Sequence, residues 1–166
     1  MNAMKLLLAL SLARPAQPAT MTATQDTGMA QNCEKEVLEL HQFFQEWFNG
    51  TLENTEAAFE RFDSVMADDF EIINPEGQKS SRAGIIARLQ AAHGFQANAT
   101  PPMRIWIENL HSRPLPGGDQ LVTYEEWQET GGITRGRLSS ALFSSSADTP
   151  NGVQWHHVHE TWLREN

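Results

Sequence analysis

Residues 155–162 read WHHVHETW, and this stretch decides the class of fold. Side chains alternate between the two faces of a β-strand, so a strand over 153–163 presents two different sets of residues. One face carries Trp155, His157, His159 and Thr161. The opposite face carries His156, Val158, Glu160 and Trp162. We therefore predict a long strand near the end of the chain, with its imidazoles divided between the faces of a sheet.

Three more strand-forming segments come before this one. Alternating apolar and polar residues predict strands over 104–110, 120–129 and 134–144. Pro, Gly and Ser residues break the alternation between them, at 114–119, at Gly131-Gly132 and in the polar loop 144–152. Strands joined by turns of this kind pair antiparallel.

The preceding part of the chain shows helical spacing of its apolar residues. The predicted N-caps are Asn32, then Asn54 or Thr55, and then Ser80 or Ser81. The three predicted helices end near Asn49-Gly50, after Met66 and at Gly94. A short strand over 70–74 lies between the second and third helices. Helices followed by strands predict an α+β fold, with the helices on one face of an antiparallel sheet.

The charge balance argues against binding to nucleic acid. The chain has 12 Lys and Arg residues and 21 Asp and Glu residues, for a net charge of −9, and the stretch 32–71 is the acidic part. Binding to a phosphate backbone needs a basic face that releases counterions. The acidic residues are instead expected on the solvent faces of the first two helices.

The first 31 residues are predicted to lie outside the fold, as a disordered tail or a marginal signal segment. Their apolar run, Leu6 to Ala13, is too short to span a bilayer. We predict a cytoplasmic protein without a membrane partner, with export as the alternative. Residues 32–166 then form one domain. Cys33 is the only cysteine and is interpreted as an inert helix residue.

Three short motifs, in order along the chain, resemble one known superfamily. An acidic pair and an aromatic strand, 68–70, come before the turn 74–77, which reads NPEG. Residues 81–86 read SRAGII, and 155–162 contains a tryptophan followed by Val-His-x-Thr. Over roughly 33 to 163 the chain resembles the nuclear transport factor 2-like (NTF2-like) superfamily, specifically its SnoaL-like and DUF4440-like branches. It departs from that pattern in the long Ser-rich loop 144–152.

The resemblance implies a cone-shaped fold, in which a curved, mainly antiparallel sheet wraps around three helices and leaves a pocket between them. It also implies frequent dimerisation through the sheet, and we expect a homodimer. It does not imply one activity, because the same fold is used by ketosteroid isomerase, scytalone dehydratase, polyketide cyclases and the association domain of a calmodulin-dependent kinase.

The histidines of 155–162 allow several interpretations. His157 and His159 share a predicted face about 6 to 7 Å apart along the strand, which would let them share a metal ion with a third ligand such as Glu126. Alternatively, His159 is a buried or pocket-edge histidine, or it serves as a general acid or base. We predict no metal site and no cofactor.

Two central strands carry a candidate polar wall. Tyr124 and Glu126 share one face of the strand 120–129, and Arg137 lies on the next strand. By analogy with the association-domain branch, Glu126 and Arg137 point into the cone. A surface ion pair is the competing interpretation. If Arg137 is buried, it needs a carboxylate partner, which is either Glu126 or a ligand anion.

We therefore predict a module that binds a small organic molecule of anionic or aromatic character. The predicted ligand-binding residues are Phe44, Phe62, Trp106, Tyr124, Glu126, Arg137, His157 and His159. The first alternative is a cofactor-free isomerase, dehydratase or cyclase that uses a pocket carboxylate or histidine as general base. Asp63, Asp68 and Asp69 are interpreted as helix-end and turn acids instead. The second alternative is a structural association domain.

Overall fold

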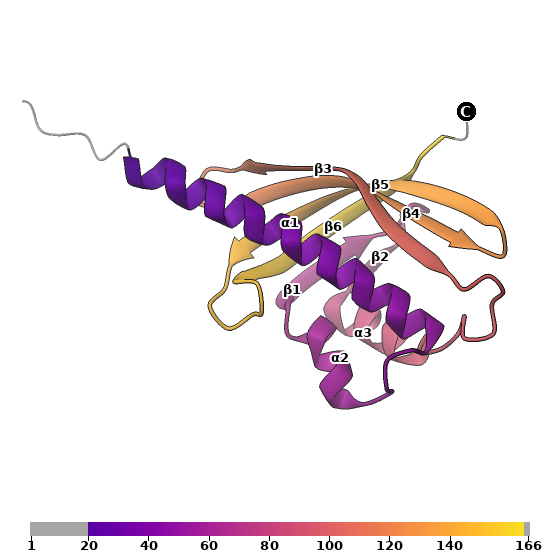
Figure 1. The fold of residues 1–166 in the computed structure, drawn as a ribbon. Coiled ribbons are helices and arrows are strands. Elements are labelled where there is room, and N and C mark those ends of the chain that lie inside the picture. Colours follow the sequence, from indigo (N-terminus) through magenta and orange to yellow (C-terminus); the bar gives the residue numbers. More distant parts are fainter. Residues whose placement is uncertain (1–19, 165–166) are drawn as a thin grey trace, which may run out of the picture.

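A computed structural model describes residues 20–164, with side chains from residue 27 onward. This part of the chain contains the helices α1 (Thr20–Asn49), α2 (Glu56–Asp63) and α3 (Arg82–Ala91). Its strands are β1 (Met66–Ile73), β2 (Lys79–Ser81), β3 (Arg104–Pro114), β4 (Gln120–Thr130), β5 (Ile133–Ser145) and β6 (Val153–Trp162). The helices lie on one side of the sheet (Figure 1), so the predicted α+β class is confirmed.

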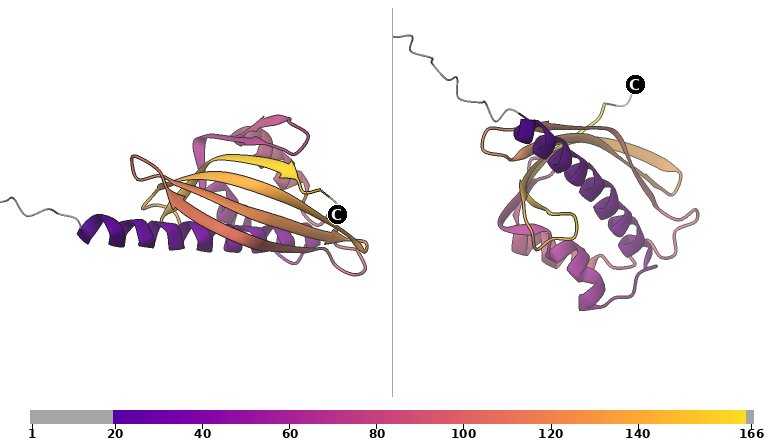
Figure 2. Two further views of the ribbon diagram at one scale, coloured as in Figure 1. Left: turned by 90° about the horizontal axis from the view of Figure 1, so that it is seen from above. Right: turned by 60° about the vertical axis from the view of Figure 1, so that its left-hand side comes forward.

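The strands form one curved sheet in the order β2-β1-β6-β5-β4-β3. All neighbouring strands are antiparallel except β1 and β6, which run parallel. The sheet bends around α1, which crosses its hollow side (Figure 2). The parallel pairing places β1, from the first half of the chain, beside the last strand.

Helix α1 begins earlier than the sequence predicts. It starts at Thr20, so the expected N-cap at Asn32 is wrong, and the predicted division between residues 31 and 32 falls inside the helix. No proline occurs between Thr20 and Asn49 to stop it, and Met29 packs against the core. The tail or signal segment predicted upstream lies outside the described residues up to position 19. No helix within residues 20–164 is long and apolar enough to cross a membrane.

The two short helices have side-chain N-caps. The Thr55 hydroxyl accepts a hydrogen bond from the Ala58 amide, and the Ser81 hydroxyl accepts one from Gly84. Both helices end sooner than predicted. The second ends at Asp63, so Met66 is not in it but begins β1, and the third ends three residues before Gly94.

A β-bulge changes the orientation of side chains along β6. Trp155 pairs with Phe143, whereas His157 pairs with the next residue back on β5, Leu142, so His156 is an extra residue. After the bulge the alternation is shifted by one position. Val158 and Glu160 therefore face the helices, and His157 and His159 do not.

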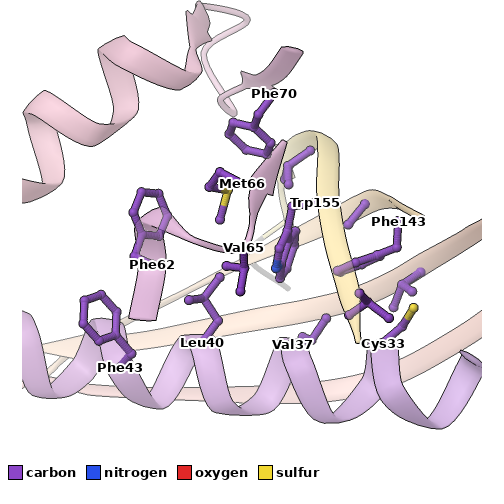
Figure 3. Packing of buried hydrophobic residues seen from close by; sticks show 14 of the residues in the cluster. Cys33, Val37, Leu40, Phe43, Phe62, Val65, Met66, Phe70, Phe143 and Trp155 are labelled. Carbon is purple, nitrogen blue, oxygen red and sulfur yellow. The ribbon is translucent and has the colours of Figure 1, made fainter. Parts of the chain in front are cut away.

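The hydrophobic core lies between α1 and the sheet (Figure 3). Val37 and Leu40 of α1 pack on Val65 and on Trp155, which tilts against Phe143 at 4.3 Å between ring centroids. Cys33 is completely buried here, and burial raises the pKa of its thiol to about 12, with the charge of Glu36 adding to the rise. The thiol therefore stays protonated at neutral pH, as expected for an inert residue.

One carboxylate inside the core has four hydrogen-bond donors. Glu36 of α1 is fully buried and accepts two bonds of 3.0 Å from Arg61 of α2. Asn151, in the loop before β6, donates at 2.8 Å, and the Trp155 indole donates at 3.2 Å. These bonds connect α1, α2, the loop and β6. A buried ionised carboxylate with this many donors holds the elements in place.

Candidate functional site

A cavity of about 300 Å³ lies between the helices and the inner face of the sheet. One wall is apolar and mainly aromatic, and includes Phe44, Phe48, Phe62, Phe70, Trp155 and Val158. The polar part of the lining, here called the polar wall, adjoins these rings and includes His41, Tyr124, Glu126, Arg137 and Glu160. This size and this mixture of walls are typical of sites for small organic molecules.

The structure brings five of the eight predicted ligand-binding residues together. Those that line the cavity are Phe44, Phe62, Tyr124, Glu126 and Arg137. The prediction that the other three side chains line it is wrong; they are Trp106, His157 and His159. The five residues meet because regular helical and strand periodicity holds throughout α1, α2, β4 and β5.

The three misplaced residues have identifiable causes. In β3 apolar residues lie on both faces, and Ile105 and Ile107 are the ones that turn inward, toward the core. Trp106 stacks on Trp127 on the outer face of the sheet, with 6.3 Å between ring centroids. His157 and His159 follow the bulge, so they also lie on the outer face.

The metal site considered for these histidines does not form. Glu126 lies on the inner face of the sheet and the two imidazoles on the outer face, so the three side chains cannot meet. Within residues 20–164, no three His, Cys, Asp or Glu side chains are arranged to hold a metal ion.

Glu126 and Arg137 form a buried ion pair across β4 and β5. Arg137 donates from Nε at 3.0 Å and from Nη2 at 2.6 Å, one bond to each carboxylate oxygen of Glu126. Glu126 is 3% exposed, so this is not the surface pair that was the competing interpretation. Burial alone would raise the pKa of Glu126, but the charges of Arg137 and His41 outweigh it and lower the pKa.

Glu160 of β6 shares the same guanidinium but is held less well. Its oxygens lie 3.3 Å from Nε and 3.4 Å from Nη1 of Arg137, distances at the weak end of hydrogen bonding. Burial raises the pKa of Glu160 to about 7, because Arg137 offsets only part of the desolvation and the charge of Glu126 adds to the rise. This cavity carboxyl therefore exchanges a proton near neutral pH.

His41 completes the network from α1. Its Nδ1 lies 2.7 Å from the Val37 carbonyl oxygen and its Nε2 lies 3.2 Å from Oε2 of Glu126. Both oxygens are acceptors, so the ring nitrogens of His41 contact them as hydrogen-bond donors. The polar wall thus contains a guanidinium, an imidazole and two carboxyl groups, and the pKa of one of these, Glu160, is raised toward neutral pH.

Two polar residues of the wall were missed by the sequence prediction. His41 could have been found, because it follows Val37 by four residues and precedes Phe44 by three, on the predicted inner face of the helix. Glu160 was placed on the face opposite His159, and nothing in the sequence showed which face was inward. The bulge decides that question.

Comparison with known proteins places the chain in a family. Residues 33–164 match the model of the family described as sucrose-6-phosphate phosphohydrolase C-terminal. The chain belongs to this family. It is 26% identical, over 129 and 130 residues, to sucrose-phosphatases 2 and 1 of Nicotiana tabacum, and the matches cover 77% and 78% of the chain. The matched region is only 30% of the length of each of these relatives.

Solved structures show that this sucrose-6-phosphate phosphohydrolase C-terminal domain has the NTF2-like fold that the sequence predicted. It superposes on an NTF2-like protein of unknown function from Pseudomonas aeruginosa with a TM-score of 0.69 and 18% identity, covering 80% of this chain and 99% of that one. A CaMKII hub from S. rosetta gives a TM-score of 0.51 and 11% identity, covering 90% and 100%. Such low identities establish the fold alone.

The mouth of the cavity in this family member is bordered by the end of β6 and the turn after β1. The Trp162 indole donates a 2.9 Å hydrogen bond to Oε1 of Glu76, and both side chains line the cavity. Trp162 is 44% exposed. An aromatic ring that borders the mouth can contact both a bound molecule and solvent.

The acids interpreted as helix-end and turn residues lie outside the cavity. Asp63 is at the end of α2 and forms an ion pair with Arg82, with 2.7 Å between Oδ1 and Nη2. Asp68 and Asp69 lie within β1 rather than in a loop, and both are exposed. The carboxyl groups available to a bound molecule are therefore those of Glu126, Glu160 and Glu76.

Proposed function

We propose that this domain binds a small organic molecule in the cavity. One observation carries the proposal: the aromatic lining of the cavity adjoins a buried network in which Glu160 has only long contacts to Arg137. A buried polar group without a good partner costs free energy of folding. A ligand that hydrogen-bonds to Glu160 would supply that partner while its apolar part packs on the rings of Phe44 and Phe62.

The network favours a neutral, hydroxyl-bearing ligand over an anion. Both oxygens of Glu126 already accept hydrogen bonds from Arg137, so an anion bound at this network would have to displace this carboxylate and would also face Glu160. A hydroxyl group can donate to Glu160 when it is ionised and accept from it when it is protonated. Because the matched relatives are named sucrose-phosphatases, sucrose is the first compound to test, with sucrose 6-phosphate as the anionic comparison.

A thermal-shift titration with one matched pair of variants tests the proposal. Val158→Phe fills the cavity from β6, and His159→Phe introduces the same ring on the outer face of the same strand. A ligand at 100 times its Kd stabilises the folded protein by about 2.7 kcal/mol. For a domain of this size that raises the Tm by about 5–10 °C.

We expect this shift in the wild type and in His159→Phe, and no shift in Val158→Phe. A shift of equal size in Val158→Phe would place the ligand elsewhere and contradict the proposal. The panel contains sucrose, sucrose 6-phosphate and a neutral aromatic alcohol. If neither sucrose nor the aromatic alcohol stabilises the wild type, the neutral ligand class is wrong.

A cofactor-free enzyme is the second candidate, and Glu160 is the observation that favours it. A general base works best when its pKa is close to the operating pH, and burial raises the pKa of Glu160 to about 7 inside the cavity. Glu160 would remove a proton from a bound substrate, with His41 as a nearby donor. Turnover of a bound compound that is lost in Glu160→Gln, while binding is retained, supports this candidate; binding without turnover contradicts it.

We also propose that a second copy of this chain packs on the outer face of β3, β4 and the first half of β5. That face carries the stacked Trp106 and Trp127 and the exposed Leu138, an apolar surface that water disfavours. Light scattering after size-exclusion chromatography should give the mass of a dimer, and Leu138→Lys should give a monomer. A wild-type monomer at all concentrations contradicts this assembly.

A further inference from the structure

Three side chains on the outer face of the sheet form a hydrogen-bonded relay. Ser144 of β5 has its Oγ 2.7 Å from Nε2 of His156, on β6. The Nδ1 of the same imidazole lies 3.1 Å from Oδ1 of Asp69, on β1. These strands are neighbours in the order β1-β6-β5, so the histidine lies between its two partners. None of the three lines the cavity.

The chemistry of Asp69 selects one tautomer of the His156 ring. An ionised carboxylate can only accept, so Nδ1 of His156 carries the ring proton and donates it to Asp69. In the neutral imidazole Nε2 then has a free lone pair, which can accept the hydroxyl proton of Ser144. A hydroxyl that donates to a neutral imidazole, which is in turn oriented by a carboxylate, is the arrangement of an activated serine nucleophile.

The bulge in β6 builds this arrangement. His156 is the extra residue, opposite a break in the β5 pairing, and the β1 pairing also shifts between Met66 and Glu71. Bulges re-aim side chains and are frequent beside active sites. The Asp69 side chain is 80% exposed and that of His156 is 29% exposed, so a reagent in solution can reach them.

We propose that Ser144 is a nucleophile that accepts acyl groups from small activated esters, with His156 as its general base. Oγ attacks the ester carbonyl carbon while its proton passes to Nε2. The bond to the alcohol then breaks, and the alcohol leaves with that proton. Water, deprotonated by His156, attacks the acyl-serine and releases the carboxylic acid, restoring Ser144. Asp69 is a positioning residue, because it holds the tautomer of the imidazole.

The experiment labels the full chain with a fluorophosphonate probe and maps the adduct by mass spectrometry. We expect one adduct, on Ser144, and none in Ser144→Ala. General-base assistance is commonly worth about 10²–10⁴-fold, so His156→Gln should slow labelling by about 100-fold or more. Ser140→Ala is the matched control: Ser140 lies on the same face of β5, opposite His159, and its labelling rate should equal that of the wild type.

The role of Asp69 has its own test. Asp69→Asn places an amide donor against Nδ1, reverses the tautomer of His156 and should slow the labelling of Ser144 at least tenfold. Asp69→Glu keeps a carboxylate acceptor and should retain most of the wild-type labelling rate. If His156→Gln does not fold, the comparison of Asp69→Asn with Asp69→Glu tests the proposal in its place. No adduct on Ser144, or an adduct that forms equally fast in His156→Gln and Asp69→Asn, would show an ordinary surface hydrogen bond and overturn the proposal.

Discussion

Two buried carboxylate networks in this domain use the same residue types in opposite ways. Glu36 has two bonds from Arg61, one from Asn151 and one from Trp155, and it is surrounded by packed core. Glu160 has only long contacts to a guanidinium whose shorter bonds go to Glu126, and it faces a cavity. A carboxylate with all its partners stabilises the fold, whereas one that lacks partners beside a cavity is available to a ligand.

The same change, Glu to Gln, should therefore have opposite effects in the two networks. Glu36→Gln turns an amide NH₂ toward groups that can only donate, namely the Arg61 guanidinium and the Trp155 indole. Breaking a buried charge network in this way costs about 3–5 kcal/mol of unfolding free energy. Urea denaturation at pH 7 measures it. A loss below about 1 kcal/mol would show that the network is not structural.

Glu160→Gln should instead stabilise the domain above neutral pH. The folded protein holds the Glu160 proton more tightly than the unfolded chain does, so the free energy of unfolding of the wild type falls as the pH rises from 4.5 to about 7. The change in pKa corresponds to about 3 kcal/mol of unfolding free energy. The wild type has this contribution at low pH and has lost it above pH 7. Gln mimics the protonated carboxyl and should remove this decline.

Denaturant unfolding at several values of pH compares Glu160→Gln with the wild type. Glu108→Gln, an exposed residue on the outer face of β3, is the control and should follow the wild type throughout. A difference between Glu160→Gln and the wild type that stays constant between pH 4.5 and pH 8 would contradict the assigned protonation of Glu160.

The smallest effect is expected at the rim of the structural network. Glu39 accepts a 2.7 Å bond from Asn151, and this hydrogen bond is the main cause of its lowered pKa, but its side chain is 44% exposed. Water can replace the lost bond in Glu39→Gln, so the cost should stay below about 1 kcal/mol in urea denaturation. A cost as large as that of Glu36→Gln would show that burial is not what separates the two positions.

Much of this fold could be predicted from the sequence because it rests on local signals. Thr55 and Ser81, each one of two predicted alternatives, are N-caps; alternation put Tyr124 and Glu126 on one face of β4, and the family resemblance pointed Glu126 and Arg137 into the cone. These positions follow from helical and strand periods that are not interrupted.

The remaining errors arise where a single irregularity resets the period. Because His156 is an extra residue, Val158 and Glu160 face inward, where uninterrupted alternation would have placed His157 and His159. No composition signal marks the bulge, because it depends on how β5 and β1 pair with β6. The early start of α1 is a second case, since Asn32 is a good cap only if the residues before it are not already helical.

The assignment of the cavity as a binding site depends most directly on the state of Glu160. Carbon-detected NMR of the side-chain carboxyl groups, with Glu160→Gln to identify the resonance, measures its titration in the ligand-free protein. A midpoint near pH 7 is the predicted result. A Glu160 that stays ionised from pH 5 to pH 8 would mean that Arg137 satisfies it fully, as Arg61 and its neighbours satisfy Glu36, and the cavity wall would be structural.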